Sequence, residues 1–216
     1  MANKASKQNL IDDKNYLLNE SNYYGEDETL KYQIIIGNTG RNTLIDNNHT
    51  DFSYFNAWKL RRNGKHKENA MFSIDTFGKV YQHFNPRYWS EFIENSDVNQ
   101  NIISIALHNE GLLKQDNLNN KFYGWENLKY SNINPPVYKQ WRNNHYWASY
   151  TKEQYKSLSK LLIKLCDEFH IPKKLTNHNT IIDGIENFEG ICTKANYDFE
   201  YTDVSPAFEW DKIKLK

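Results

Sequence analysis

The side chains best suited to chemistry in this sequence are three histidines, His83, His108 and His178, and the cysteine Cys192. Imidazole nitrogens and thiolates are preferred zinc ligands, and zinc held by three such groups activates water for hydrolysis. The four residues lie far apart in the chain, and Cys192 has no CxxC partner. We expect structural roles for His83 at the end of a hairpin and for His178 in a loop, with metal binding as the alternative for each.

His108 follows a buried strand and should face the opposite side of that strand from Leu107, so its imidazole is a candidate to line a groove. Cys166 and Cys192 are too few for a disulfide framework. We expect both to be buried or loop thiols rather than a redox pair. A metal site would have to be rebuilt from these scattered residues.

Length and charge limit the class of protein. A chain of 216 residues is long enough for one full-sized domain with an appended arm. Its 27 basic residues balance 27 acidic residues, so we expect no binding to nucleic acid or to an anionic membrane surface. The sequence contains no apolar run of the roughly 18 residues that a membrane span needs, and no secretory signal. We therefore expect a cytoplasmic protein that phage lysis or a secretion system would release.

The hydrophobic pattern predicts an α/β fold in a single domain, with a mixed central sheet flanked by helices. Buried strands are expected at residues 31–36 and 101–107, and a β-hairpin at 69–84 turns at Gly78. The stretch Thr151-Lys152-Glu153-Gln154 matches a capping box, and the apolar residues behind it recur at helical spacing. This pattern predicts one long helix after the box.

Other segments are expected to surround this core. Residues 1–30 should form an N-terminal arm that packs on a domain at 31–216, with one short helix at 11–20. Further helices are expected at 52–62 and, as a short terminal helix, after Pro206.

Residues 112–150 are rich in aromatic residues and asparagine and contain Pro135-Pro136. We expect a surface insertion with a small hairpin at 121–130. Such a segment would serve as a lid over a site or as an interface.

Five segments follow one another in a recognisable order: the strand IIIGNTG, the hairpin SIDTFGKVYQHF, the strand SIALHNEG, the helix TKEQYKSLSKLL and the segment TDVSPAFEW. Together they resemble the type 2 N-acetylmuramoyl-L-alanine amidase and peptidoglycan-recognition protein family over residues 31–212. TDVSPAFEW is similar to the Asp-Pro-Gly-Pro-x-Phe-x-Trp segment of that family. The resemblance implies the same fold and, in active members, a zinc ion that cuts the bond between the sugar lactyl group and the stem peptide.

The family pattern places four chemical positions in this sequence. Its two histidine ligands fall on Gly37, in Ile35-Ile36-Gly37-Asn38-Thr39, and on or next to Lys194. Its third zinc ligand falls on Asp203, and its catalytic carboxylate falls on Ala106. The resemblance therefore implies a degenerate site with no metal and no cofactor. We hypothesise that the Lys194 ammonium replaces the zinc charge and pairs with Asp203, with a helix cap or turn brace as the alternative role of Asp203.

The resulting hypothesis is an amidase-like protein without hydrolytic activity that binds peptidoglycan fragments, or another small ligand, in the old substrate groove. The expected groove residues are Asn38, Thr39, His83, His108, Asn109, Lys194 and Asp203. One alternative is an active amidase with displaced metal ligands. Another is a structural, interaction or sequestering protein of a phage or secretion system, with a protein partner or a second copy bound at the insertion.

Overall fold

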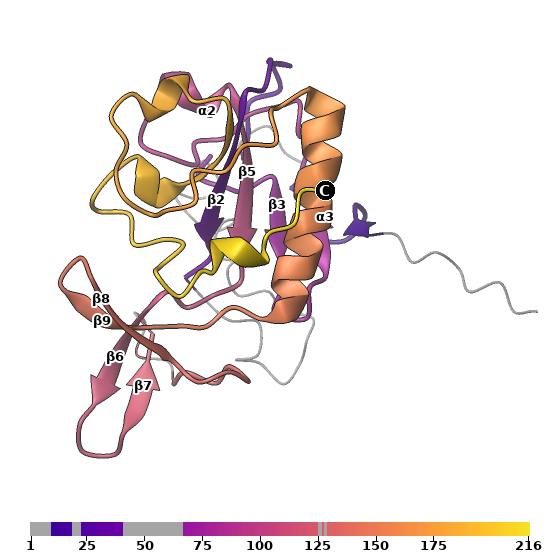
Figure 1. Ribbon diagram of the computed structural model, residues 1–216. Coiled ribbons are helices and arrows are strands. Elements are labelled where there is room, and N and C mark those ends of the chain that lie inside the picture. The colour runs from indigo at the N-terminus through magenta and orange to yellow at the C-terminus, as the bar shows by residue number, and fades with distance from the viewer. Residues whose placement is uncertain (1–9, 19–22, 41–66, 125–126, 128) are drawn as a thin grey trace, which may run out of the picture.

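The computed structural model describes residues 10–18, 23–40, 67–124, 127 and 129–216. Its centre is a six-stranded sheet in the order β1-β4-β3-β5-β2-β10 (Figure 1). The strands of this sheet are β1 (Ile11–Asp12), β2 (Gln33–Asn38), β3 (Phe72–Ile74), β4 (Val80–Gln82), β5 (Ile102–Leu107) and β10 (Gly190–Thr193). Strands β3, β5, β2 and β10 run parallel, whereas β4 is antiparallel to β3. The expected α/β fold with a mixed central sheet is confirmed.

Strand β2 lies in the interior of the sheet, and its central residues are apolar. Ile34, Ile35 and Ile36 are each 0% exposed. Successive side chains of a strand point to opposite faces, so a strand with no exposed residue must be covered on both sides. Both faces of the sheet at β2 are therefore buried.

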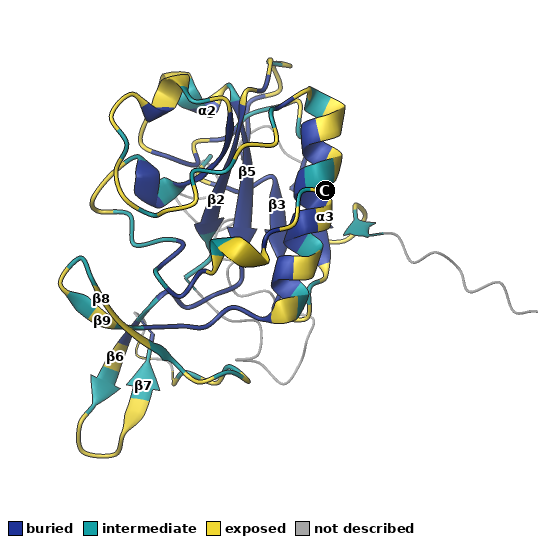
Figure 2. Ribbon diagram, viewed as in Figure 1, coloured by how far each residue is buried: buried dark blue, intermediate teal, exposed yellow. Residues whose placement is uncertain are grey.

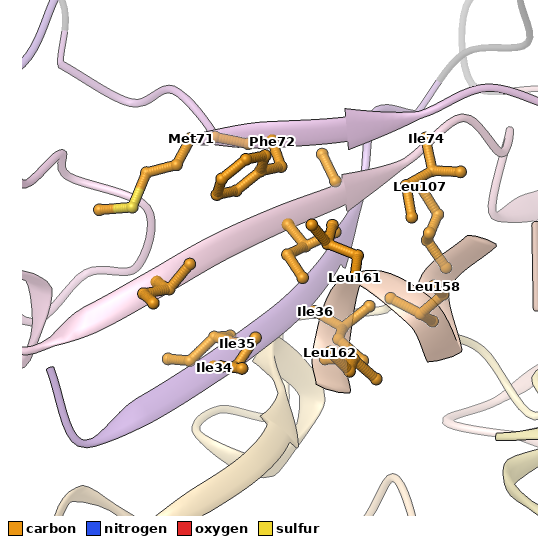
Figure 3. Close-up of a cluster of buried hydrophobic side chains, with 14 of the residues drawn as sticks. Ile34, Ile35, Ile36, Met71, Phe72, Ile74, Leu107, Leu158, Leu161 and Leu162 are labelled. Carbon is orange, nitrogen blue, oxygen red and sulfur yellow. The ribbon is translucent and has the colours of Figure 1, made fainter. Parts of the chain in front are cut away.

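One face of the sheet is covered by α3 (Lys152–Phe169), the long helix expected behind the capping box. Figure 3 shows Ile36 of β2 close to Leu161 and Leu162 of α3. These leucines recur at helical spacing with Leu158 and Leu165, and all four are buried. The opposite side of the helix is exposed, as Figure 2 shows by its yellow segments. The apolar stripe of α3 thus packs against this face of the sheet.

The hairpin of β3 and β4 and the beginning of α3 hold each other in place. Gly78 lies in the hairpin turn with a φ of +80°, and a Cβ there would stand 2.6 Å from the carbonyl oxygen of Glu153. Thr151 Oγ1 donates to the carbonyl oxygen of Thr76 at 2.8 Å and accepts the N–H of Gln154 at 3.1 Å. Glycine is therefore required at the turn both by its conformation and by its contact with α3.

The insertion forms a second sheet and is more ordered than the expected excursion with one hairpin. Its four antiparallel strands, in the order β7-β6-β9-β8, project away from the main sheet in Figure 1. They are β6 (Leu112–Asp116), β7 (Lys121–Tyr123), β8 (Val137–Trp141) and β9 (Asn144–Trp147). In the expected hairpin at 121–130, an isolated antiparallel bridge joins Tyr123 to Lys129.

The two ends of the insertion lie side by side. The N–H of Ala148 donates to the carbonyl oxygen of Gly111 at 2.8 Å. Asn109 reinforces this neck, because its Nδ2 donates to the carbonyl oxygen of Ser149 at 3.0 Å and its Oδ1 accepts the N–H of Gly111 at 2.8 Å. The chain therefore leaves and rejoins the main domain at one point.

The described part of the N-terminal arm contains a strand where a helix was expected. Strand β1 pairs in parallel with Val80 and Tyr81 of β4, so the outer edge of the sheet supplies hydrogen-bond partners that override the local helical pattern. Leu18 is 1% exposed, and its N–H donates to the carbonyl oxygen of His83 at 2.8 Å. The arm thus packs against the sheet edge at β4.

The remaining helical elements are short. They are α2 (Ser96–Asn99) and the 3-10 helices η3 (Ile185–Asn187), η4 (Lys194–Asn196) and η5 (Trp210–Lys212). Element η5 lies where the short terminal helix was expected, whereas the helix expected at 52–62 lies outside the described residues. Within the described ranges, no helix is both long enough and apolar enough to cross a membrane.

Candidate functional site

Three adjacent strands bring the positions singled out by the sequence resemblance to one edge of the main sheet. Gly37 of β2 and Ala106 of β5 are direct register partners. Ile36 of β2 pairs with Thr193, the last residue of β10, and Lys194 follows immediately in η4. The carboxyl ends of parallel strands meet at the same edge, which is where open α/β sheets place their ligands. The structure thus brings Gly37, Ala106 and Lys194 together.

Gly37 leaves a slot that the side chain of Lys194 fills. A Cβ at residue 37 would stand 2.8 Å from Lys194 Cδ and 2.9 Å from Phe92 Cζ. A side chain at residue 37 would therefore require Lys194 or Phe92 to move. Beyond the slot, Lys194 Nζ lies 4.6 Å from the ring centroid of Phe92 and 4.8 Å from that of Tyr201. These distances are typical of cation–π contacts.

Asp203 faces the same space but has a different partner from the one hypothesised. Its Oδ1 accepts the N–H of Asn38 at 2.7 Å. This bond ties the late loop, residues 194–203, to the end of β2. None of the ion pairs among the described residues joins Asp203 to Lys194. The hypothesised ion pair is therefore wrong in this structure, because two aromatic rings rather than a carboxylate hold the ammonium.

These residues open into a groove of about 720 Å³. Because Ile36 faces α3 and side chains alternate along a strand, Gly37 points to the other face of the sheet, toward the groove. Of the expected groove residues, the described walls include Asn38, Thr39, Lys194 and Asp203. The segment of residues 91–100, which contains α2, forms another wall.

Glu110 is a groove residue that sequence reasoning missed. Glu110 lines the groove from the segment that follows β5, although the residue is only 5% exposed. The available signal was the run of polar residues, His108 to Glu110, directly after an apolar strand. Glu110 lies beyond the position of Ala106 along the chain, so it does not replace the carboxylate of the family pattern residue for residue.

His83 and His108 lie in the core, which differs from their expected place in the groove. Both residues are 0% exposed. His83 Nε2 is 2.9 Å from Ser73 Oγ, and its Nδ1 is 2.8 Å from the carbonyl oxygen of Tyr16. Burial lowers the pKa of His83 to about 4, and burial also lowers the pKa of His108 well below its ordinary value. Both imidazoles are therefore neutral at neutral pH.

The other candidates are also placed away from the described groove walls. Asn109 is 0% exposed and holds the neck of the insertion through Gly111. Cys192 is fully buried in β10, where burial raises the pKa of its thiol. His178 Nδ1 lies 2.8 Å from Thr180 Oγ1 in an exposed loop. Among the residues that the structure describes, no three or more His, Cys, Asp and Glu side chains are grouped to hold a metal ion.

The insertion contacts this site through Arg142, which sequence reasoning also missed. Its guanidinium stacks on the ring of Trp141 at 4.2 Å and donates to carbonyl oxygens of the late loop. The acceptors are Ala195 at 2.8 Å, Asp198 at 2.9 Å, Phe199 at 2.7 Å, and Tyr201. A single side chain of the second sheet therefore fixes the loop that runs from Lys194 to Asp203.

Comparisons with known proteins identify the family of this chain and two proteins of similar fold. A family model described as N-acetylmuramoyl-L-alanine amidase matches residues 27–190. The N-acetylmuramoyl-L-alanine amidase LysC from Clostridium intestinale URNW has 13% identity and a TM-score of 0.51, with 94% of this chain and 93% of that chain covered. The endolysine LysCS from the same organism has 13% identity and a TM-score of 0.52, with 94% and 91% covered. None of the curated protein sequences compared with the chain matches it.

Proposed function

Because this chain belongs to the N-acetylmuramoyl-L-alanine amidase family, we propose that its groove binds peptidoglycan fragments without zinc and without hydrolysing them. The observation that carries this proposal is the side chain of Lys194, which fills the slot over Gly37. In the family pattern these two positions hold zinc ligands. In this chain the first position is Gly37, which has no side chain, and the second is Lys194, whose side chain is cationic.

The residues at the family's metal positions do not fit a zinc ion. A catalytic zinc takes three protein ligands and keeps a fourth position for water. Gly37 has no side chain to donate a ligand atom, and the ammonium of Lys194 opposes a second cation. Asp203 alone offers a donor, and its Oδ1 already accepts the N–H of Asn38. One carboxylate is too few to retain the metal.

An active amidase with displaced metal ligands has little support. His83, His108 and Cys192 are all 0% exposed, and none of them is among the described groove residues. A ligand set built from these residues would require the core to open. The lowered pKa of His83 and the raised pKa of Cys192 follow from burial, which is a structural cause rather than a catalytic one.

The groove itself is suited to a small ligand. Its volume of about 720 Å³ lies within the range of roughly 300 to 1,000 Å³ that is usual for such sites. Its described walls combine aromatic rings, such as Trp89, Phe92 and Tyr201, with polar residues. Rings stack on apolar faces of sugars, and polar groups bond to peptides. Peptidoglycan fragments carry both components, so this ligand class fits the groove and the family.

Two measurements on the purified protein test the proposal. Metal analysis after growth with added zinc should give far less than one equivalent, and calorimetry with N-acetylmuramoyl-L-alanyl-D-isoglutamine should show saturable binding with a Kd below about 1 mM. Chromatography of the incubated ligand should recover it intact. Zinc near one equivalent, together with chelator-sensitive release of the peptide, would overturn the proposal, as would the absence of binding.

A variant supplies the positive control for the metal analysis. Gly37→His combined with Lys194→His removes the filled slot and restores both histidine positions beside Asp203. This double variant should retain zinc more tightly than the unmodified chain. The comparison shows that the assay detects the metal when the ligands are present.

A further inference from the structure

We propose that Lys194 recognises a carboxylate of the ligand, so that this position has changed from holding a metal cation to holding an anion. This inference rests on the proposed function, since it concerns the ligand of the same groove. It names the chemical class more closely: a peptide fragment with a free carboxylate.

The ammonium of Lys194 has hydrogen-bonding capacity that the described part of the chain does not use. A lysine ammonium has three N–H donors and no acceptor. Within the described residues, the contacts of Lys194 Nζ are the rings of Phe92 and Tyr201, and no hydrogen bond or ion pair is made by this atom. Aromatic rings attract the charge but do not accept conventional hydrogen bonds. A groove ligand with oxygen acceptors would satisfy these donors.

The ammonium is also held in a fixed position before any ligand binds. The stem of Lys194 is confined by the slot over Gly37. The Tyr201 ring is fixed at both ends, because its hydroxyl accepts the N–H of Glu94 at 2.8 Å and its carbonyl oxygen accepts from Arg142. A charge that is already oriented loses less conformational freedom on binding. Lys194 is therefore better placed to select a ligand than a freely moving surface lysine.

The other charges of the groove favour a single carboxylate over a phosphate or another polyanion. Beside Lys194, the described walls carry the carboxylates of Glu91, Glu94 and Asp203. A dianion would be repelled by this lining, whereas one carboxylate can bind at Lys194 if the rest of the ligand is neutral or carries amino groups. The free carboxyl end of a short peptide meets this requirement.

A pair of small probes tests the inference. N-acetyl-D-alanine carries the carboxylate, and its primary amide is nearly the same shape without the charge. Titration of each into the labelled full-length chain, followed by amide NMR spectra, should shift the signals of Lys194, Phe92 and Tyr201 saturably with the acid. Binding of the amide should be at least about tenfold weaker, the factor expected when a hydrogen bond to a charged group is lost.

Variants separate recognition from simple filling of space. Lys194→Met keeps the unbranched apolar stem without the charge and should abolish the preference for the acid. Lys194→Arg should retain the preference, and Lys156→Met, on the exposed side of α3, should leave it unchanged. Each variant should keep a dispersed spectrum, so that loss of folding is recognised.

Several outcomes would overturn the inference. These are equal binding of acid and amide, an unchanged preference in Lys194→Met, stronger binding of inorganic phosphate than of the acid, or no shift at millimolar probe. If the muramoyl peptide binds in calorimetry while acid and amide are not distinguished, only this inference fails. If the peptide does not bind but the acid selectively shifts the three signals, the proposed function fails and the carboxylate site stands.

Discussion

Gly37 and Lys194 share one space: the Cδ atom of Lys194 lies 2.8 Å from the point where a Cβ of residue 37 would stand. Each residue therefore limits the side chain that the other position can carry. Gly37 needs no side chain for the core, since the buried contacts of β2 are made by its isoleucines. Lys194 in turn can reach between Phe92 and Tyr201 only because residue 37 is so small.

Gly37→Ala should lower the free energy of unfolding by about 2 kcal/mol, because the added methyl group overpacks the slot. Lys194→Ala in the same chain should recover part of that loss, whereas Phe92, 2.9 Å from the same point, keeps the recovery incomplete. Urea denaturation of both single variants and of the double variant gives a coupling energy, expected to be about 1 kcal/mol. Strictly additive effects would show that the two side chains do not compete for this space.

Arg142→Ala should loosen the late loop and weaken ligand binding, because the guanidinium satisfies carbonyl oxygens along that loop. We expect a loss of roughly 1 to 3 kcal/mol in stability, since hydrogen bonds to a charged group are removed. Hydrogen exchange should accelerate at residues 195–203 more than in α3. Lys156→Ala, on the exposed face of α3, is the control. Unchanged protection of residues 195–203 in Arg142→Ala would show that the guanidinium does not hold the loop.

Gly78→Ala should be more destabilising than Gly184→Ala, although both residues have a positive φ of +80° and +74° respectively. Alanine at either site suffers backbone strain of about 1 to 3 kcal/mol. At Gly78 the methyl group would also meet the Glu153 carbonyl oxygen at 2.6 Å, whereas at Gly184 the nearest atom is 3.9 Å away. Thermal or urea unfolding compares the pair directly. Equal losses would mean that the hairpin does not press against α3.

Acidification should destabilise the fold before most carboxylates are protonated. The pKa of His83 is lowered from 6.5 to about 4 by burial, so between these values the unfolded chain binds a proton that the folded chain does not. Stability therefore falls as the pH drops from about 6.5 to about 4, by roughly 3 kcal/mol from this residue. The lowered pKa of His108 acts in the same direction.

Urea denaturation between pH 7 and pH 4.5 measures this dependence. His83→Gln should flatten the pH dependence over that interval, even though it lowers stability throughout. An identical slope in the unmodified chain and in His83→Gln would remove His83 as its cause.

The main sheet, the hairpin and α3 could be predicted because their signals are local. Ile34 to Ile36 form a continuous apolar run, Gly78 marks a turn, and Thr151 and Gln154 form a box at the start of a periodic helix. The second sheet could not be predicted in the same way. Strand β8 has mostly exposed residues and lacks apolar alternation, and its pairing is fixed by β9.

Of the expected groove residues, Asn38, Thr39, Lys194 and Asp203 line the groove, whereas His83, His108 and Asn109 are buried elsewhere. The family pattern indicated Gly37, Ala106, Lys194 and Asp203, and the strand register brings the first three together. The placement of the Lys194 ammonium depends on Phe92 and Tyr201, which come from distant segments. The ion pair expected between Lys194 and Asp203 is replaced by contacts of the ammonium with these two rings. Burial of His83 and His108 likewise follows from tertiary packing rather than from strand alternation alone.

The narrow neck at Gly111 and Ala148 makes the insertion a natural place for grafting. Gly111 and Ala148 are already joined by a hydrogen bond, so a replacement segment of different length would start and end at neighbouring points. It would leave the register of β5 and the position of α3 unchanged. Such a chimera would keep the scaffold but would lose the contribution of Arg142 to the late loop. Replacing the whole second sheet therefore also removes one of the contacts that hold the groove rigid.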